Sequence, residues 1–169
     1  IAVTVKFKVK NPEKIGLSGE VCLLAWTTTP WTLPGNVALA IGEDIEYPLI
    51  EHAPISGEPG PDIKGGIYII SKEALDRLLR IPEFREIATK LMPGEKKSPY
   101  PYKTVKGVAL RGLEYKPPFD YYINDKTLKN RENGWKVYAA DFVTTDTGTG
   151  IAHEAPAFGA DDWELLKKV

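Results

Sequence analysis

Two short segments of this chain combine side chains that could do chemistry. Residues 26–36 read WTTTPWTLPGN, in which four threonines and two tryptophans occupy six of the first seven positions. Each threonine carries a hydroxyl that both donates and accepts hydrogen bonds, together with an apolar methyl group. Such a segment can line a small pocket that is half polar and half apolar. The competing interpretation is a proline-rich corner whose tryptophans only anchor the core.

The second segment, residues 146–162, reads DTGTGIAHEAPAFGADD. Its glycines at 148 and 150 permit close backbone approach and unusual torsion angles. The turn at residues 159–161 is expected to bring the start of a last helix back toward His153. Acidic residues at a helix N-terminus also act as caps or dipole partners. This alternative explains Asp161 alone better than it explains two adjacent aspartates, Asp161 and Asp162.

Three other kinds of site find little support in the same segment. The pattern Gly148-x-Gly150 lacks the third glycine of a dinucleotide fingerprint, because His153 stands there, and no Gly-Lys-Ser/Thr run indicates a phosphate loop. Asp146-Thr147-Gly148 matches the Asp-Thr-Gly of aspartic proteases, which need two carboxylates that share a proton. With one copy in the chain, that activity would require a homodimer.

The elements that must position these segments are mostly short strands. Period-2 alternation and short apolar runs predict strands at residues 1–9, 21–26, 37–41, 47–51, 67–70, 105–113 and 137–143. Pro48 demotes its strand to an edge or a bulge. Helices are expected at residues 71–80, with Ser71 as the cap, from Pro82 to about residue 91, and from Asp161 onward. Residues 53–66 and 95–103 form turn-rich or polar excursions, and residues 144–150 form a loop rich in Gly and Thr.

Length and composition set the class of protein. The 169 residues are 43% hydrophobic and 27% charged, which excludes a disordered chain or a coiled coil. A net charge of −1 shows no basic excess, one cysteine (Cys22) excludes an internal disulfide, and two histidines make a structural zinc site improbable. No apolar run reaches the roughly 18 residues of a membrane span. We expect one α+β domain over residues 1–169, mainly β, with a barrel-like core and a few short helices. The start without Met indicates a segment cut from a longer chain.

Taken together and in this order, the two segments resemble the editing domain of isoleucyl-tRNA synthetase. That domain is inserted into the catalytic fold of the large synthetases for isoleucine, valine and leucine. Residues 26–34 look like the family's threonine-rich segment, and residues 148–162 are similar to its G-T-G-x-x-H-x-A-P…D-D segment. Valine and leucine relatives typically have arginine where this chain has Thr29. The H-I-G-H and K-M-S-K-S signatures of the synthetic site are absent, so the resemblance is to the editing domain alone.

The resemblance implies roles for individual residues. Asp162 aligns with the carboxylate that pairs with the α-ammonium group of the misattached amino acid, and Asp161 is its neighbour. The residues that would line the side-chain pocket are Trp26, Thr27, Thr29, Thr32 and His153. His153 would help to block the extra methylene of isoleucine and would position groups rather than act as a simple general base. Thr28 would orient the terminal adenosine or the attacking water, and Asn36 is a further candidate for the same rim.

The activity implied by the resemblance is hydrolysis of the ester in Val-tRNA(Ile), and also of valyl-adenylate. One missing methylene is worth only about 1–3 kcal/mol, a figure for which this enzyme family is the standard example, so a synthetic site alone cannot reject valine. The family implies no metal and no organic cofactor. The implied partners are the tRNA(Ile) acceptor end with its misattached valine and the catalytic and anticodon-binding domains of the parent synthetase, in a cytoplasmic monomer away from membranes.

Two alternatives stay open at this point. One is a non-catalytic module that only holds the tRNA acceptor end, which the near-neutral charge disfavours. The other is editing of the valine or leucine type, in which threonyl or norvalyl esters are the better substrates. The chain also departs from common bacterial members, which have Val, Thr and His where this sequence has Ala152, Glu154 and Phe158.

Overall fold

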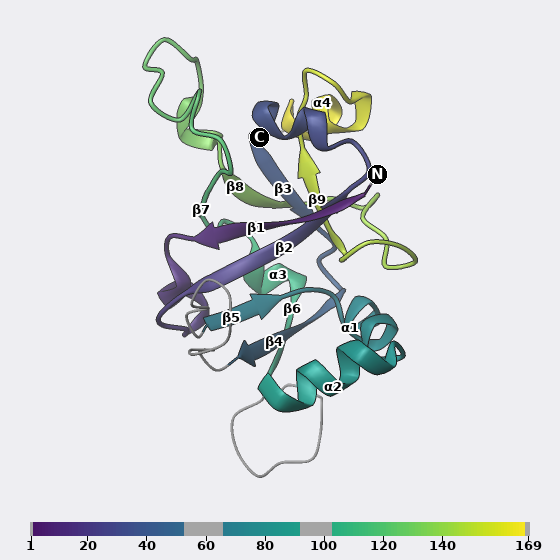
Figure 1. Ribbon diagram of the computed structural model, residues 1–169. Helices are drawn as coiled ribbons and strands as arrows, with labels where there is room; N and C mark the ends of the chain where they lie inside the picture. The colour runs from purple at the N-terminus through teal and green to yellow at the C-terminus, as the bar shows by residue number, and fades with distance from the viewer. Residues whose placement is uncertain (1, 53–65, 92–102, 168–169) are drawn as a thin grey trace, which may run out of the picture.

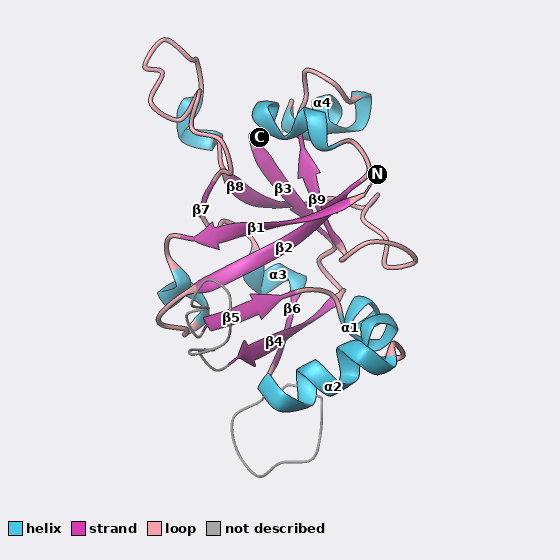
Figure 2. Ribbon diagram, in the orientation of Figure 1, coloured by secondary structure: helices cyan, strands magenta, loops and turns pink. Residues whose placement is uncertain are grey.

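The computed structural model describes residues 2–52, 66–91 and 103–167 (Figure 1). Within these residues the chain forms nine strands, four α-helices and three short 3-10 helices. The strands make two sheets at the centre, and the helices lie around them (Figure 2). The predicted α+β class, mainly β with a few short helices, is therefore confirmed. The expected excursions at residues 53–66 and 95–103 lie almost wholly outside the described residues.

The larger sheet has the strand order β6-β4-β5-β2-β1-β7. Its members are β1 (Val3–Val9), β2 (Val21–Thr27), β4 (Glu46–His52), β5 (Gly66–Ile69), β6 (Thr104–Lys106) and β7 (Tyr115–Lys116). The alternation predicted for the N-terminal residues is seen in β1, where Phe7 and Val9 are buried and Lys8 between them is exposed. β1 runs antiparallel to β2, with Val3 opposite Thr27, and this pairing fixes where β2 ends.

The smaller sheet has the order β8-β3-β9 and is formed by β3 (Ala38–Ile41), β8 (Lys136–Ala139) and β9 (Ile151–Glu154). All four residues of β3 are buried, as expected of the central strand of a sheet covered on both faces. β9 also packs against β2 of the larger sheet. The ends of these two strands, which carry the two segments singled out in the sequence, therefore lie together.

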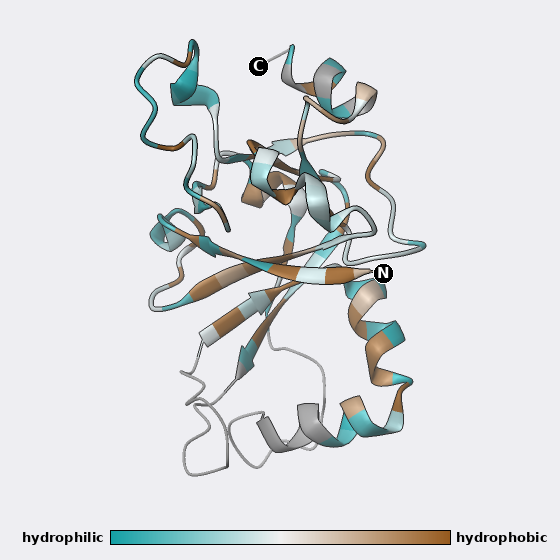
Figure 3. Ribbon diagram, turned by 45° about the horizontal axis from the view of Figure 1, so that its top comes forward, coloured by the Kyte–Doolittle hydropathy of each residue, from teal (hydrophilic) through white to brown (hydrophobic). Residues whose placement is uncertain are grey.

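Four helices flank the sheets: α1 (Lys72–Leu79), α2 (Pro82–Leu91), α3 (Gly107–Leu110) and α4 (Ala160–Leu166). Ser71 caps α1 as predicted, since its Oγ accepts a hydrogen bond from the Ala74 amide at 3.2 Å. The apolar side of α1, with Leu75 and Leu79, packs against Ile70, the residue that follows β5. The main core fills the space between the sheets, and Figure 3 shows its hydrophobic strands at the centre of the molecule.

The structure corrects several details of the predicted strands. In the described residues the strands form two open sheets and not a closed barrel. β4 is not an edge strand, because β5 and β6 pair with its two sides. It tolerates Pro48 because pairing with β5 begins only at Leu49, so the missing N–H of Pro48 interrupts no hydrogen bond of that ladder.

The strand predicted at residues 105–113 ends at Lys106, the last residue of β6. Gly107 packs so closely on Gly42 that a Cβ atom would lie 2.0 Å from the Gly42 carbonyl oxygen. The chain turns into α3 at this contact. The sequence analysis did not predict β9 (Ile151–Glu154), so the position of His153 on a strand is a finding of the structure.

Candidate functional site

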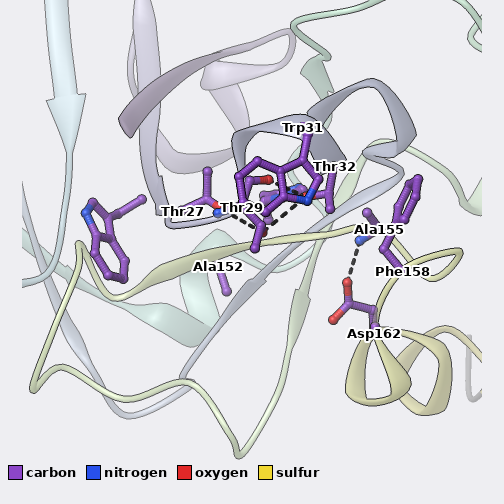
Figure 4. A pocket seen from close by; sticks show the side chains of 11 residues that line it. Thr27, Thr29, Trp31, Thr32, Ala152, Ala155, Phe158 and Asp162 are labelled. Atoms are coloured by element: carbon purple, nitrogen blue, oxygen red, sulfur yellow. Dashed lines mark hydrogen bonds between the residues drawn. The ribbon is translucent and has the colours of Figure 1, made fainter. Parts of the chain in front are cut away.

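The two segments singled out in the sequence line one cavity of about 370 Å³ (Figure 4). One wall comes from the end of β2 and the 3-10 helix that follows it, η2 (Pro30–Gly35). The other wall comes from β9, the turn after it and the start of α4. The lining residues are Trp26, Thr27, Thr29, Trp31, Thr32, Ala152, His153, Ala155, Phe158, Gly159 and Asp162. Six of the nine predicted site residues are among them.

The hydroxyl wall, formed by Thr27, Thr29 and Thr32, is held by its own hydrogen bonds. The Thr29 amide donates to Thr27 Oγ1 at 3.1 Å, and the Thr27 and Thr29 hydroxyl oxygens lie 3.2 Å apart. Thr32 donates its hydroxyl proton to the Thr29 carbonyl at 2.8 Å. Local bonds of this kind between threonine and the backbone favour turns over regular structure. The threonines therefore present fixed methyl and hydroxyl groups to the cavity.

A hydrogen bond of 2.8 Å between Thr32 Oγ1 and His153 Nε2 joins the two walls. A carbonyl can only accept, so the single proton of the Thr32 hydroxyl is used on Thr29. Nε2 of His153 must then carry the proton that it donates to Thr32, which assigns the Nε2–H tautomer. Nδ1 is buried and has no hydrogen-bond partner among the described residues.

Electrostatics favour the neutral form of His153. Burial lowers the pKa of its imidazole below the ordinary value, and the nearby Asp162 carboxylate opposes this effect only in part. At neutral pH the side chain is uncharged. It therefore contributes shape and one hydrogen bond to the cavity, and no positive charge that would repel a cationic ligand.

Asp162 stands in the first turn of α4 with its carboxylate pinned to the backbone. Its Oδ2 accepts a hydrogen bond of 2.6 Å from the Ala155 amide, drawn as a dashed line in Figure 4. Gly159 makes this arrangement possible, because a Cβ atom there would lie 2.7 Å from Oδ1. The predicted approach of the last helix to the end of the His153 segment is thus found, and it fixes a carboxylate at the cavity wall.

Three predicted site residues are not among those that line the cavity. Thr28 is exposed and does not line the cavity. Asn36, expected at the rim, is only 3% exposed: its Nδ2 donates to the Ala38 carbonyl at 2.9 Å, and its Oδ1 accepts from the Tyr115 hydroxyl at 2.7 Å. It satisfies buried polar groups of the core instead of facing a ligand. Asp161 belongs to α4, but its side chain lies outside the described residues.

Sequence reasoning missed two aromatic residues of the cavity mouth. Trp31 and Phe158 both line the cavity, yet 68% and 63% of their surfaces remain exposed. Both rings are therefore accessible to a ligand that enters the cavity. The signal was available, since each lies inside one of the two segments.

Trp26 is fixed from behind by the loop at residues 144–150. Gly148 adopts φ +65°, and a Cβ atom at this position would lie 2.9 Å from Trp26 Cε3. Arg77 of α1 donates to the carbonyls of Thr145 and Gly148, at 2.5 Å each, and so ties the loop to the helix. The glycine predicted to permit close approach therefore serves to seat the tryptophan against the loop.

Comparison with known proteins relates this chain to isoleucine–tRNA ligases. No protein-family model matches the chain. The isoleucine–tRNA ligase of Treponema denticola is 39% identical over 98% of this chain, and that of Aquifex aeolicus is 34% identical over 96% of it. The chain is homologous to one segment of isoleucine–tRNA ligase. It spans about 15% of the length of each of these relatives.

The fold agrees with that homology to a tRNA ligase. The editing domain of cytosolic leucyl-tRNA synthetase from P. knowlesi superposes on 99% of this isoleucine–tRNA ligase homologue with a TM-score of 0.67 at 15% identity, and 62% of that domain is covered. The GlLeuRS-CP1 structure gives a TM-score of 0.63 at 16% identity. The segment therefore has the fold of a synthetase editing domain. In its described residues, no helix combines the length and the apolar character needed to cross a membrane.

Proposed function

We propose that this chain is the hydrolytic editing domain of an isoleucine–tRNA ligase and that it cleaves the ester between a misattached valine and tRNA(Ile). Water adds to the ester carbonyl and the bond to the ribose oxygen breaks, which releases valine and free tRNA. The observation that carries the proposal is the single cavity in which a hydroxyl wall, a neutral histidine and a pinned carboxylate meet.

Asp162 suits the α-ammonium group of an aminoacyl ester. Its carboxylate is oriented by the Ala155 amide and stands at the cavity wall. A charge-assisted contact of this kind is about twice as strong as a neutral hydrogen bond, and it rejects acylated amines, which carry no charge. The neutral His153 supports this role, because a second cation in the cavity would compete for the carboxylate.

The hydroxyl wall and His153 suit a small branched side chain. Their positions are fixed by hydrogen bonds of 2.8–3.2 Å, so the wall cannot yield easily to a larger group. Forcing one additional methylene against a fixed wall typically costs about 1–3 kcal/mol. We infer that valine is accepted and isoleucine is excluded by this contact, the reverse of the preference of the synthetic site.

In this proposal the cavity promotes hydrolysis by positioning the ester and a water molecule, without a general base from His153. Nε2 of His153 already carries the proton donated to Thr32, and its pKa is depressed by burial, so the imidazole is not arranged as a base toward Thr32. An aminoacyl ester is an activated substrate, and holding it and a water in reacting contact can supply several kcal/mol. Thr28, exposed at the same bend, remains our candidate for orienting the terminal adenosine or the water.

The test is deacylation of paired substrates. The chain is mixed with Val-tRNA(Ile) and with Ile-tRNA(Ile), and loss of each ester is followed. Faster loss of valine is expected; equal loss of both esters, or no loss of either when the parent ligase supplies tRNA docking, contradicts the proposal. Threonyl and norvalyl esters are included, because preferential cleavage of these would indicate editing of the valine or leucine type. Binding of tRNA without turnover would indicate a non-catalytic module.

A further inference from the structure

A second feature of the molecule lies outside the site described above. Residues 117–134, here called the arm, connect β7 to β8 and project from the sheets at the end of the molecule that also carries α4 (Figures 1 and 3). Phe119, Tyr121, Tyr122 and Leu128 on the arm are all exposed, Tyr121 by 67%. Four large apolar side chains on one short excursion exceed what an isolated surface loop needs.

Cations of the arm and of the two strands that it connects lie close together in the sequence. The arm itself has three cations and three carboxylates and is neutral, whereas Lys116 of β7 and Lys136 of β8 bring residues 116–136 to a net charge of +2 on a chain that carries −1. The cations are Lys116, Lys126, Lys129, Arg131 and Lys136. Aromatic side chains interleaved with cations are typical of surfaces that bind single-stranded nucleic acid. Protein–protein interfaces, in contrast, are depleted in lysine.

Internal bonds give the arm a defined shape. The Arg131 guanidinium donates to the Ile123 carbonyl from both Nε, at 2.9 Å, and Nη2, and so ties the two sides of the arm together. The rings of Phe119 and Tyr121 stack with their centroids 5.8 Å apart and an interplanar angle of 11°. A flat, braced aromatic pair of this kind needs little ordering before a base can stack on it.

A cavity of about 260 Å³ lies beside the arm. Leu128, Lys129 and Arg131 contribute to its wall, and no carboxylate side chain of the described residues lines it. Pro156 also lines it, while the neighbouring Ala155 and Phe158 line the candidate editing cavity. The two cavities therefore lie on either side of one short turn.

The wall of this second cavity is built on a strained residue. Trp135 has φ +57°, a conformation that is an outlier for a bulky side chain. Three hydrogen bonds hold it: its amide donates to the Val37 carbonyl at 2.6 Å, its carbonyl accepts from the Tyr115 amide at 3.1 Å, and its Nε1 donates to the Asn36 carbonyl at 3.1 Å. Strain that the surroundings enforce in this way is concentrated at binding and catalytic sites.

We propose that the arm and the cavity beside it bind the single-stranded nucleotides that precede the terminal adenosine of the tRNA 3′ end. The proposal rests on the proposed function, since it takes the terminal nucleotide and its amino acid to be in the editing cavity across the turn. Lys126 and Lys129 contact the phosphates, and a base stacks on Tyr121.

The test is RNA binding by this chain and by arm variants, measured as fluorescence anisotropy of a labelled single-stranded RNA ending in CCA. K126A/K129A is expected to bind about tenfold more weakly, and the slope of log K against log salt is expected to fall by about 1.4, or about 0.7 for each phosphate that a lysine no longer neutralises. The matched control K72A/K106A removes two exposed lysines beside Glu46 and should bind as the unchanged chain does. Equal binding by K126A/K129A and the unchanged chain, or no RNA binding by the latter, overturns the proposal.

Variants of Tyr121 test the contribution of base stacking separately from that of the lysine charges. Tyr121→Ala is expected to weaken RNA binding about tenfold, whereas Tyr121→Phe, which keeps the ring, should retain it. Thermal unfolding confirms that each variant is folded. Retained binding by Tyr121→Ala would remove the ring from the site.

A minimal ester distinguishes failure of the arm from failure of the editing site. Adenosine carrying a 3′-valyl ester lacks the preceding nucleotides, so K126A/K129A should hydrolyse it as the unchanged chain does while showing a raised KM for a valylated RNA. If the unchanged chain cleaves neither ester, the proposed function fails, and RNA binding still tests the arm. If K126A/K129A loses activity on the minimal ester to the same extent as on the RNA, the arm does not act by binding the upstream nucleotides.

Discussion

The wall that follows β2 and the wall formed by β9 and α4 present different chemistry to the same cavity. The first consists of threonines whose hydroxyls are used in bonds to one another and to the backbone. The second carries the two ionisable groups, His153 and Asp162, of which one is kept neutral by burial and the other is pinned by a main-chain amide. Shape and charge are therefore supplied by different side chains. The threonines and the neutral His153 give the cavity its shape, and the Asp162 carboxylate gives it its charge, so each can be removed without the other.

Removing the charge should have the largest effect. Asp162→Ala takes away the carboxylate that receives the substrate ammonium, and loss of a charged contact of this kind costs about 3 kcal/mol, or about a hundredfold in kcat/KM for Val-tRNA(Ile). Deacylation kinetics measure it. Asp141→Ala, which removes an exposed aspartate outside the cavity lining, is the control and should keep full activity. Full activity of the Asp162→Ala chain would show that the α-ammonium group of the substrate does not bind at Asp162.

Removing shape should alter selectivity more than rate. His153→Ala enlarges the cavity next to the hydroxyl wall, and the preference for valyl over isoleucyl ester should fall about tenfold, the scale of one methylene. Competition between the two esters measures the ratio. Thr32→Val removes the hydroxyl that holds the imidazole but keeps the volume, so it should change the ratio less. A larger change in Thr32→Val would show that orientation, and not bulk, excludes isoleucine.

Gly148 and Gly112 allow the seat of Trp26 to be tested by stability. Both have positive φ, +65° and +72°, so an alanine at either should cost about 1–2 kcal/mol of backbone strain. Only at Gly148 does the new Cβ meet another side chain, whereas nothing lies within 4 Å at Gly112. Urea unfolding should therefore show Gly148→Ala to be less stable than Gly112→Ala by about 1 kcal/mol. Equal losses of stability in the two variants would mean that the Trp26 side chain moves aside for the new Cβ atom at little cost.

The smallest effect expected is a pH dependence of stability. The pKa of His153 is lowered by burial in the folded chain, so between that value and about 6.5, the ordinary histidine pKa, the unfolded chain binds more protons. The free energy of unfolding should therefore fall as pH drops below about 6.5 and should stop falling from this cause below the folded pKa. Urea titrations on the chain and on His153→Gln measure the difference. An identical pH dependence in both would exclude His153 as its source.

The sequence predicted the parts of the fold that depend on local pattern. Alternation in β1, the Ser71 cap and the apolar run of β2 are signals carried by neighbouring residues, and each element was found. β9 was missed because Ile151–Glu154 mixes small, polar and apolar residues, and its strand character comes from pairing with β3. The interruption at Gly107 depends on a contact with Gly42, which is distant in the chain.

The site was predictable to the extent that its residues lie in two compact segments. Asn36 shows the limit: it follows the threonine-rich segment directly, but its partner Tyr115 comes from β7, and this long-range hydrogen bond turns it toward the core. No local pattern signals a partner 79 residues away. The cavity beside the arm was missed for the same reason, since its wall joins Val37 (the residue before β3), the arm and the turn after β9.

The bond between Asp162 Oδ2 and the Ala155 amide has a consequence for the geometry of any cation bound there. With one oxygen committed to the main chain, Oδ1 is the atom left to receive a ligand. A planar guanidinium binds best to a carboxylate with both oxygens open, through two parallel hydrogen bonds, whereas a compact ammonium is satisfied by a single oxygen. This arrangement favours a compact ammonium group over a planar guanidinium as the partner of Asp162, in keeping with the proposed substrate.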